Sequence, residues 1–82
     1  MNVTRPDYDG IANHAINGRL DDWYRVSDNL HLTPAAARAE ARRVKVAVER
    51  RTDLKIATRI VETLSSVLTQ NYDAFIVEVK VA

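Results

Sequence analysis

The chain has no cysteine, and only two glycines and two prolines among its 82 residues. Without cysteine it has neither a disulfide framework nor a thiolate metal site. No run of 18 apolar residues occurs, which argues against a transmembrane helix. The N-terminus has no basic stretch followed by an apolar one, so we expect no secretory signal. These absences predict a cytoplasmic protein that does not enter membranes.

A strong charge of one sign is also absent. Lysine and arginine total 12 against 11 acidic residues, and the net charge of +1 gives no general attraction to nucleic acid or membrane. The distribution is uneven, because residues 34–51 carry a net +4 while both flanks are net acidic. The length suits one small domain, residues 1–82, and so small a core makes self-association a natural way to gain stability.

The residues that usually carry chemistry are few and poorly spaced for it. His14 and His31 are too far apart in sequence for a metal motif. The acidic turn at residues 7–10 fails the ligand spacing of a calcium loop in either register. Two isolated glycines cannot form a phosphate-binding loop. We therefore predict that the protein is not an enzyme, with no catalytic residue, metal, cofactor or small-molecule substrate.

Turn-forming residues are concentrated in the N-terminal part. We expect an irregular segment over residues 1–8 and a helix over residues 10–17, capped by Asp7 or Asp9. A turn at Asn17–Gly18 separates it from a second helix over residues 20–30. The alternative is one helix running through Gly18, since five apolar residues would then share a face: Ala12, Ile16, Leu20, Trp23 and Leu30.

A third helix is predicted over residues 34–51. Thr33 suits the N-cap, Pro34 suits the first helical position, and alanine has the highest helix propensity of any residue. The competing signal lies at residues 44–48, where valines alternate with other residues at the period of a strand. We favour the helix, because a strand would have to interrupt the alanine-rich run.

A fourth helix is predicted over residues 54–70, where apolar residues recur at helical spacing. Ile60 and Leu64 lie at the centre of that apolar stripe, so we expect both to be buried. Asn71 suits the end of such a helix. Together these elements predict a mainly α protein, α+β by strict count, built as a small bundle of three or four helices with a helical hairpin and a C-terminal strand.

The pattern then changes to a strand over residues 74–81. Phe75, Val77, Val79 and Val81 form its apolar face. A lone strand cannot satisfy its own backbone groups. Residues 44–48, the stretch around Val3, or the same strand of a second molecule are candidate partners. We predict a homodimer that uses these four side chains as its interface.

Two features suggest how the protein contacts other molecules. Residues 20–45 admit a helix-turn-helix interpretation, with recognition helix residues Arg38, Arg42, Arg43 and Lys45 facing nucleic acid or an acidic partner. Against it, three aspartates make the first helix acidic, and alanines fill the turn that should meet base edges. Trp23 and Tyr24 are a candidate binding anchor, although a core role is commoner for such residues.

The function that the sequence favours is that of a small non-enzymatic interaction protein. It is expected to bind and modulate another macromolecule, with a protein as the first candidate partner. Proteins of this kind are common on phages and mobile elements. The alternative is a helix-turn-helix DNA-binding transcriptional regulator.

Overall fold

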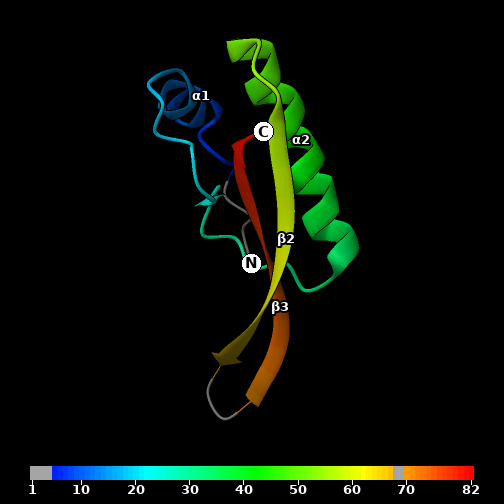
Figure 1. Ribbon diagram of the computed structural model, residues 1–82. Coiled ribbons are helices and arrows are strands. Elements are labelled where there is room, and N and C mark those ends of the chain that lie inside the picture. The colour runs from blue at the N-terminus through cyan, green and yellow to red at the C-terminus, as the bar shows by residue number, and fades with distance from the viewer. Residues whose placement is uncertain (1–4, 68–69) are drawn as a thin grey trace.

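The computed structural model describes residues 5–67 and 70–82, and within them the chain forms an α+β fold (Figure 1). Two helices and three strands follow one another in these residues: α1 (Tyr8–Ile16), β1 (Tyr24–Arg25), α2 (Pro34–Thr52), β2 (Ile56–Val67) and β3 (Gln70–Val81). The strands form one antiparallel sheet in the order β1-β3-β2. Helix α2 packs against the sheet and α1 packs against α2.

The predicted mainly α bundle is therefore wrong. Residues 54–70 do not form a helix, because β2 occupies most of them. Residues 20–30 are irregular apart from the short strand β1. β-Branched residues, which favour strands over helices, are frequent along β2, and they outweigh its helix-like apolar spacing.

Each of the two helices in the described residues begins directly after a capping residue that the sequence predicted. The Asp7 carboxylate accepts a hydrogen bond from the Gly10 N–H at 3.1 Å, so α1 begins two residues earlier than expected. Gly18 adopts a positive φ of 72°, which ends the helix and rules out one continuous helix through this point. The Thr33 hydroxyl accepts from the Ala36 N–H at 3.2 Å, with Pro34 first in α2.

Helix α2 covers residues 44–48, so the strand alternative for that segment is wrong. The helix ends at Thr52, and Asp53 follows in the left-handed conformation with φ 58°. Neither α1 nor α2 is long and apolar enough to cross a membrane.

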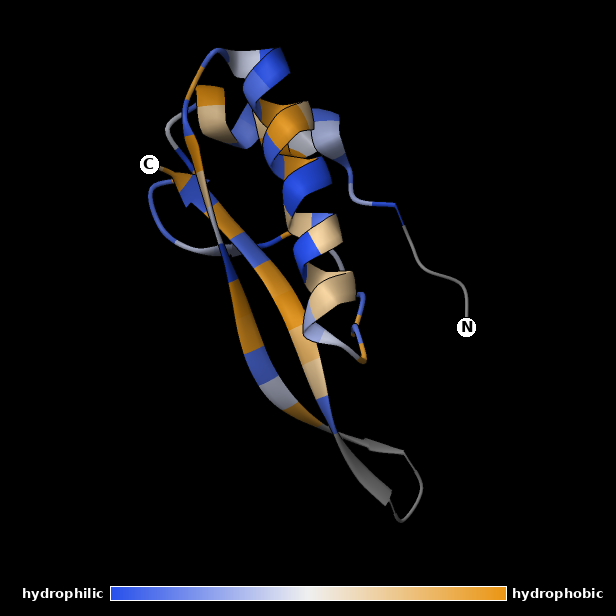
Figure 2. Ribbon diagram, turned by 90° about the vertical axis from the view of Figure 1, so that its right-hand side faces the viewer, coloured by the Kyte–Doolittle hydropathy of each residue, from blue (hydrophilic) through white to orange (hydrophobic). Residues whose placement is uncertain are grey.

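The core lies between α1, α2 and the sheet. Apolar and polar bands alternate along the strands in Figure 2, as expected for a sheet whose two faces differ. Val77 and Val79 of β3 are almost completely buried. The core also includes Ile11, Ala12, Ala15, Leu20, Val26, Ala37, Ala41, Val44, Val48 and Ile56.

The strand expected at residues 74–81 is present, but β3 is the central strand and its partners are in the same chain. One side pairs with β2 along its whole length. On the other side β3 pairs with β1, and Phe75 exchanges backbone hydrogen bonds of 2.9 and 2.8 Å with His31. The reason for expecting a dimer interface at Phe75, Val77, Val79 and Val81 is wrong, because these side chains pack with the chain's own core, but dimerisation itself stays a prediction.

The β2–β3 hairpin extends past the N-terminal end of α2 (Figures 1 and 2). This extension makes the molecule elongated, with dimensions of 44 × 21 × 18 Å. Ile60 is only partly buried, and Leu64 is 66% exposed. The expectation that both would be buried is therefore wrong, because α2 does not reach Leu64.

Candidate anion-binding site

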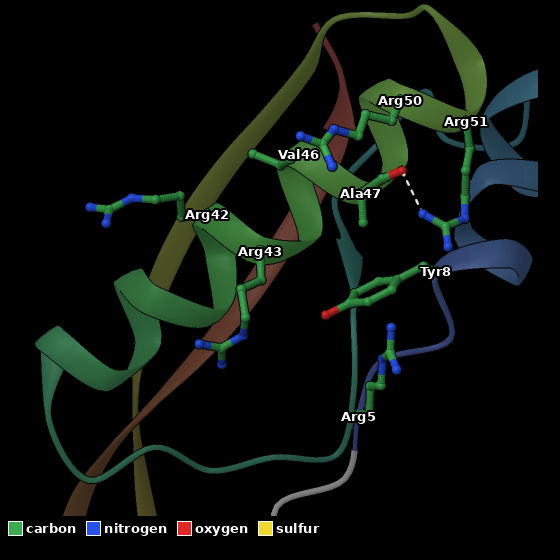
Figure 3. Close-up of a pocket in the computed structure, with 8 residues that line it drawn as sticks. All are labelled: Arg5, Tyr8, Arg42, Arg43, Val46, Ala47, Arg50 and Arg51. Carbon is green, nitrogen blue, oxygen red and sulfur yellow. Dashed lines mark hydrogen bonds between the residues drawn. The ribbon is translucent and has the colours of Figure 1, made fainter.

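An open hollow of about 480 Å³ lies between α2 and the segment that leads into α1 (Figure 3). We call it the arginine hollow. Five of its eight lining residues are arginines, and the full set is Arg5, Tyr8, Arg42, Arg43, Val46, Ala47, Arg50 and Arg51.

Helical periodicity places the α2 residues of the hollow on one face. Arg43, Ala47 and Arg50 are three or four positions apart, so their side chains are neighbours on the helix surface. The opposite face of α2 carries the buried stripe that includes Val44 and Val48. Because that stripe is held against the sheet, the arginine face is directed outward.

The N-terminal segment completes the hollow through Tyr8. The Tyr8 ring lies between two guanidinium groups, with Arg5 5.0 Å and Arg51 5.6 Å from the ring centroid (Figure 3). Arg51 is also held by hydrogen bonds from Nε to Asp9 Oδ1 at 2.7 Å and from Nη1 to the Ala47 carbonyl at 2.9 Å. Cation–π contacts and these bonds keep Arg51 in place before any ligand arrives.

The hollow carries more positive than negative charge. Asp9 pairs with Arg51, but within residues 5–67 and 70–82 no carboxylate pairs with Arg5, Arg42, Arg43 or Arg50. All four of these guanidinium groups are on exposed residues. Such a cluster attracts anions, and guanidinium groups can form paired hydrogen bonds with carboxylate or phosphate oxygens.

The four basic residues predicted to contact a partner do not form one surface. Arg42 and Arg43 line the hollow, and Arg38 is exposed on α2 outside its lining. Lys45 is directed toward β2, where its Nζ donates to Glu49 Oε2 at 3.0 Å and to the Ile56 carbonyl at 2.8 Å.

Glu49 belongs to the same contact between α2 and β2. A hydrogen bond from the Ile56 backbone N–H, followed in size by the hydrogen bond from Lys45, lowers the pKa of the Glu49 carboxyl. Lys45 and Glu49 thus fasten the start of β2 to α2, and Lys45 is a structural residue.

Trp23 and Tyr24 lie on an irregular segment and on β1, not on a helix. The Trp23 ring stacks with two cations of the sheet, Arg59 at 4.4 Å and Lys80 at 5.0 Å. Tyr24 is 40% exposed, and its ring centroid lies 5.5 Å from that of His14. Neither residue lines the arginine hollow, and their role as a binding anchor stays a prediction.

The helix-turn-helix geometry proposed for residues 20–45 is absent, because residues 20–30 are not helical. Only the second helix of the proposed motif exists, as α2. In a helix-turn-helix motif the first helix positions the recognition helix on the DNA. Residues 20–45 therefore do not form this motif.

A buried polar cluster invites comparison with a catalytic triad because it contains serine, histidine and glutamate. Glu40 is 1% exposed and lies at its centre: Ser27 Oγ donates to Glu40 Oε1 at 2.9 Å, and His31 Nε2 lies 2.7 Å from Glu40 Oε2. In a triad the histidine stands between nucleophile and carboxylate. Here the carboxylate stands between the other two, so the arrangement differs from that of a triad, and the cluster joins the loop around residues 27–31 to α2.

Besides Val46 and Ala47, sequence reasoning missed four residues of the hollow: Arg5, Tyr8, Arg50 and Arg51. Arg50 follows Arg43 by seven positions, a spacing that places both on one helix face and was available from the sequence. Arg5 and Tyr8 carry no such signal, since only the packing of α1 against α2 brings them to this face.

The described residues define a small α+β protein with a basic hollow on its long helix, and they contain no cluster of His, Cys, Asp or Glu able to hold a metal ion. Comparisons with family models, curated proteins and solved structures gave no match. Among the described residues, the arginine hollow is the feature that bears most directly on function.

Proposed function

We propose that this protein is a small non-enzymatic interaction protein that binds an anionic macromolecule through the arginine hollow. The observation that supports this proposal is the gathering of five arginines from two segments in one open hollow, with one carboxylate bonded among them. Keeping like charges together costs free energy, and an anionic ligand reverses that cost. The cytoplasmic location and the phage or mobile-element origin stay predictions.

Nucleic acid is the class of anion that this surface fits best. Arginine is the preferred residue for bidentate contacts with phosphate. The exposed arginines of α2 that line the hollow run from Arg42 to Arg50, a rise of about 12 Å at 1.5 Å per residue. A row of cations of that length suits successive phosphates of a strand, and phosphate contacts fix position without reading sequence. We therefore expect binding with little sequence preference.

The test is the binding of labelled random-sequence DNA and RNA, single- and double-stranded, measured by fluorescence anisotropy over a range of salt concentrations. Replacing Arg42, Arg43 and Arg50 together with glutamine should weaken binding at least tenfold. The slope of log affinity against log salt should fall by about 0.7–0.9 for each phosphate that the variant no longer neutralises. Circular dichroism should show an unchanged fold, since all three side chains are exposed.

The matched control removes three equal charges outside the hollow, with glutamine at Arg19, Arg25 and Lys55, all of them exposed. This variant should keep most of the affinity and the salt slope of the wild type. No binding of any of the four nucleic acids at about 50 mM salt would overturn the nucleic-acid assignment. Acidic polypeptides, tested alongside as poly-glutamate, would then be the remaining class of anionic partner.

A further inference from the structure

Strand β2 lies at the edge of the sheet, since the strand order is β1-β3-β2. The hydrogen bonds of Ile56 show which backbone groups of β2 point away from β3. The Ile56 N–H donates to Glu49 Oε2 at 2.9 Å and its carbonyl accepts from Lys45 Nζ at 2.8 Å, so both groups point away from β3. In an antiparallel ladder this direction alternates along the strand. Thr58, Ile60, Glu62 and Leu64 therefore direct their N–H and C=O groups outward as well.

The odd-numbered residues of β2 direct their backbone N–H and C=O groups toward β3. The Lys55 carbonyl accepts from the Ala82 N–H at 2.9 Å, on the side of β3. The far side of β3 is engaged with other segments, because the Val81 N–H donates to the Leu20 carbonyl at 2.9 Å and Phe75 pairs with His31. The β2 edge is thus a long open edge of this sheet.

Within residues 5–67 and 70–82, the chain protects that edge only at its first position. The Lys45–Glu49 pair covers Ile56, but in the described part of the chain no hydrogen-bond partner faces the outward groups of the four following even-numbered residues. β2 contains no proline or glycine that would discourage pairing. A long unprotected edge of this kind is a template for another strand.

We propose that β2 pairs with β2 of a second copy of this chain, antiparallel and centred on Ile60, to form one continuous six-stranded sheet. A two-fold axis perpendicular to the sheet generates this pairing, and it keeps each face of one β2 beside the same face of the other. Ile60 then lies opposite Ile60 of the partner subunit, and Thr58 lies opposite Glu62 of the partner subunit. Each of these pairs exchanges two backbone hydrogen bonds.

Side-chain chemistry favours this register. Glu62 is exposed and has no ion-pair partner in the described residues. Opposite Thr58, its carboxylate comes close to the start of the facing strand, where the Lys45 side chain is 44% exposed and its Nζ donates to the Ile56 carbonyl. The pairing therefore brings the Glu62 carboxylate toward the Lys45 ammonium group, which Glu49 already contacts, twice, once on each side of the axis.

The next possible register, centred on Val61, is worse because it places Glu62 opposite Ile60. In the Val61-centred register a carboxylate and an apolar side chain lie directly opposite each other, and side chains in such positions contact one another.

The inference is independent of the proposed function, because it rests on the β2 edge and not on the arginine hollow. Its first test is sedimentation velocity over protein concentrations from about 1 μM to about 1 mM, the range in which modest affinities become visible. The second measurement is residue-resolved amide hydrogen exchange at both ends of that range. We expect a dimer at high concentration, with added protection at the amides of Thr58, Ile60 and Glu62.

The amides of Ala57, Arg59 and Val61 serve as internal controls. Their N–H groups face β3, so their protection against exchange should change much less with protein concentration than that of the even-numbered amides. A chain that stays monomeric throughout would overturn the proposal. A dimer that leaves the exchange of the even-numbered amides unchanged would overturn it as well.

A pair of charge-matched variants completes the test. Glu62→Lys should weaken dimerisation at least tenfold, because it places a lysine beside Lys45 of the partner subunit. Asp73→Lys makes the same charge change at an exposed position of the same hairpin, on β3, and should leave dimerisation near the wild-type level. Equal effects of the two variants would show a general charge effect and would overturn the proposed register.

Discussion

The two halves of the β2–β3 hairpin share one backbone ladder but differ in what covers them. In the root, residues 56–60 and 77–81, α2 packs on one face, and the Trp23 ring stacks with Arg59 and Lys80 of the sheet. In the outer half, residues 61–67 and 70–76, described side chains such as Glu62 and Leu64 are exposed, although Ala74 is buried. Continuous pairing therefore does not by itself bury a hairpin, and the packing of α2 decides which half belongs to the core.

The boundary between the halves coincides with the buried cluster around Glu40. The Glu40 carboxylate accepts hydrogen bonds from Ser27 and from Asn29 Nδ2, at 2.9 and 3.0 Å, and lies 2.7 Å from His31 Nε2. His31 in turn pairs with Phe75 of β3 through its backbone. One carboxylate on α2 thus fixes the loop that lines the sheet at the point where the hairpin leaves the body.

The largest effect is expected from Glu40→Ala. It leaves His31 and Ser27 buried or half-buried without their acceptor, and removing one partner of a buried pair costs about 3–5 kcal/mol. Urea unfolding of dilute, monomeric protein measures the loss.

Glu40→Gln keeps the shape of the side chain and part of its hydrogen bonding, so it should cost less, about 1–3 kcal/mol. Glu62→Ala, on the exposed outer half, is the control and should change stability by about 0.5 kcal/mol or less. Equal costs for Glu40→Ala and Glu62→Ala would contradict a structural role for the cluster.

The second prediction compares two positions on one face of β2. Ile56 is 1% exposed in the root and Leu64 is 66% exposed in the outer half. Ile56→Ala should destabilise the monomer by about 2–5 kcal/mol, because it opens a cavity beneath α2. Leu64→Ala should change the stability by about 0.5 kcal/mol or less. Thermal or urea unfolding at low protein concentration measures both, and a large cost for Leu64→Ala would mean that the outer half is covered in the monomer.

The same comparison explains which parts of the fold the sequence predicts. Helix α2 is determined locally, by the Thr33 cap, Pro34 and the alanines, and its prediction is confirmed. β2 is different, because its apolar residues fit both a helical stripe and a strand with two half-covered faces. Its content of Ile, Val and Thr favours a strand, whereas the spacing of its apolar residues favours a helix. The irregular segment 20–30 owes its path to pairing with β3, which no local pattern shows.

The candidate site divides in a similar way. Arg42 and Arg43 were predicted because a basic run on one helix is visible in the sequence. Arg5 and Tyr8 join them only through tertiary packing, and Arg51 meets Asp9 across 42 positions of sequence. The partner-binding role predicted for Lys45 also rested on its place on the helix alone. In the structure Lys45 Nζ donates to the Ile56 carbonyl of β2 instead. Contacts between segments that are far apart in the sequence could not be predicted from local sequence patterns.

The smallest expected effect concerns the contact that fastens the root to α2. The Glu49 carboxyl has its pKa lowered below its usual value of 4.5, first by the Ile56 N–H and then by Lys45. The ionised Glu49 carboxylate therefore stabilises the fold fully at pH values above 4.5, and this stabilisation is lost as the pH falls through the lowered pKa. The difference in unfolding free energy between wild type and Glu49→Gln should be largest near neutral pH and should shrink under acid conditions. Lys45→Met should reduce this pH dependence without abolishing it, since the Ile56 N–H remains. A difference between wild type and Glu49→Gln that does not change with pH would show that this carboxylate does not fasten β2 to the helix.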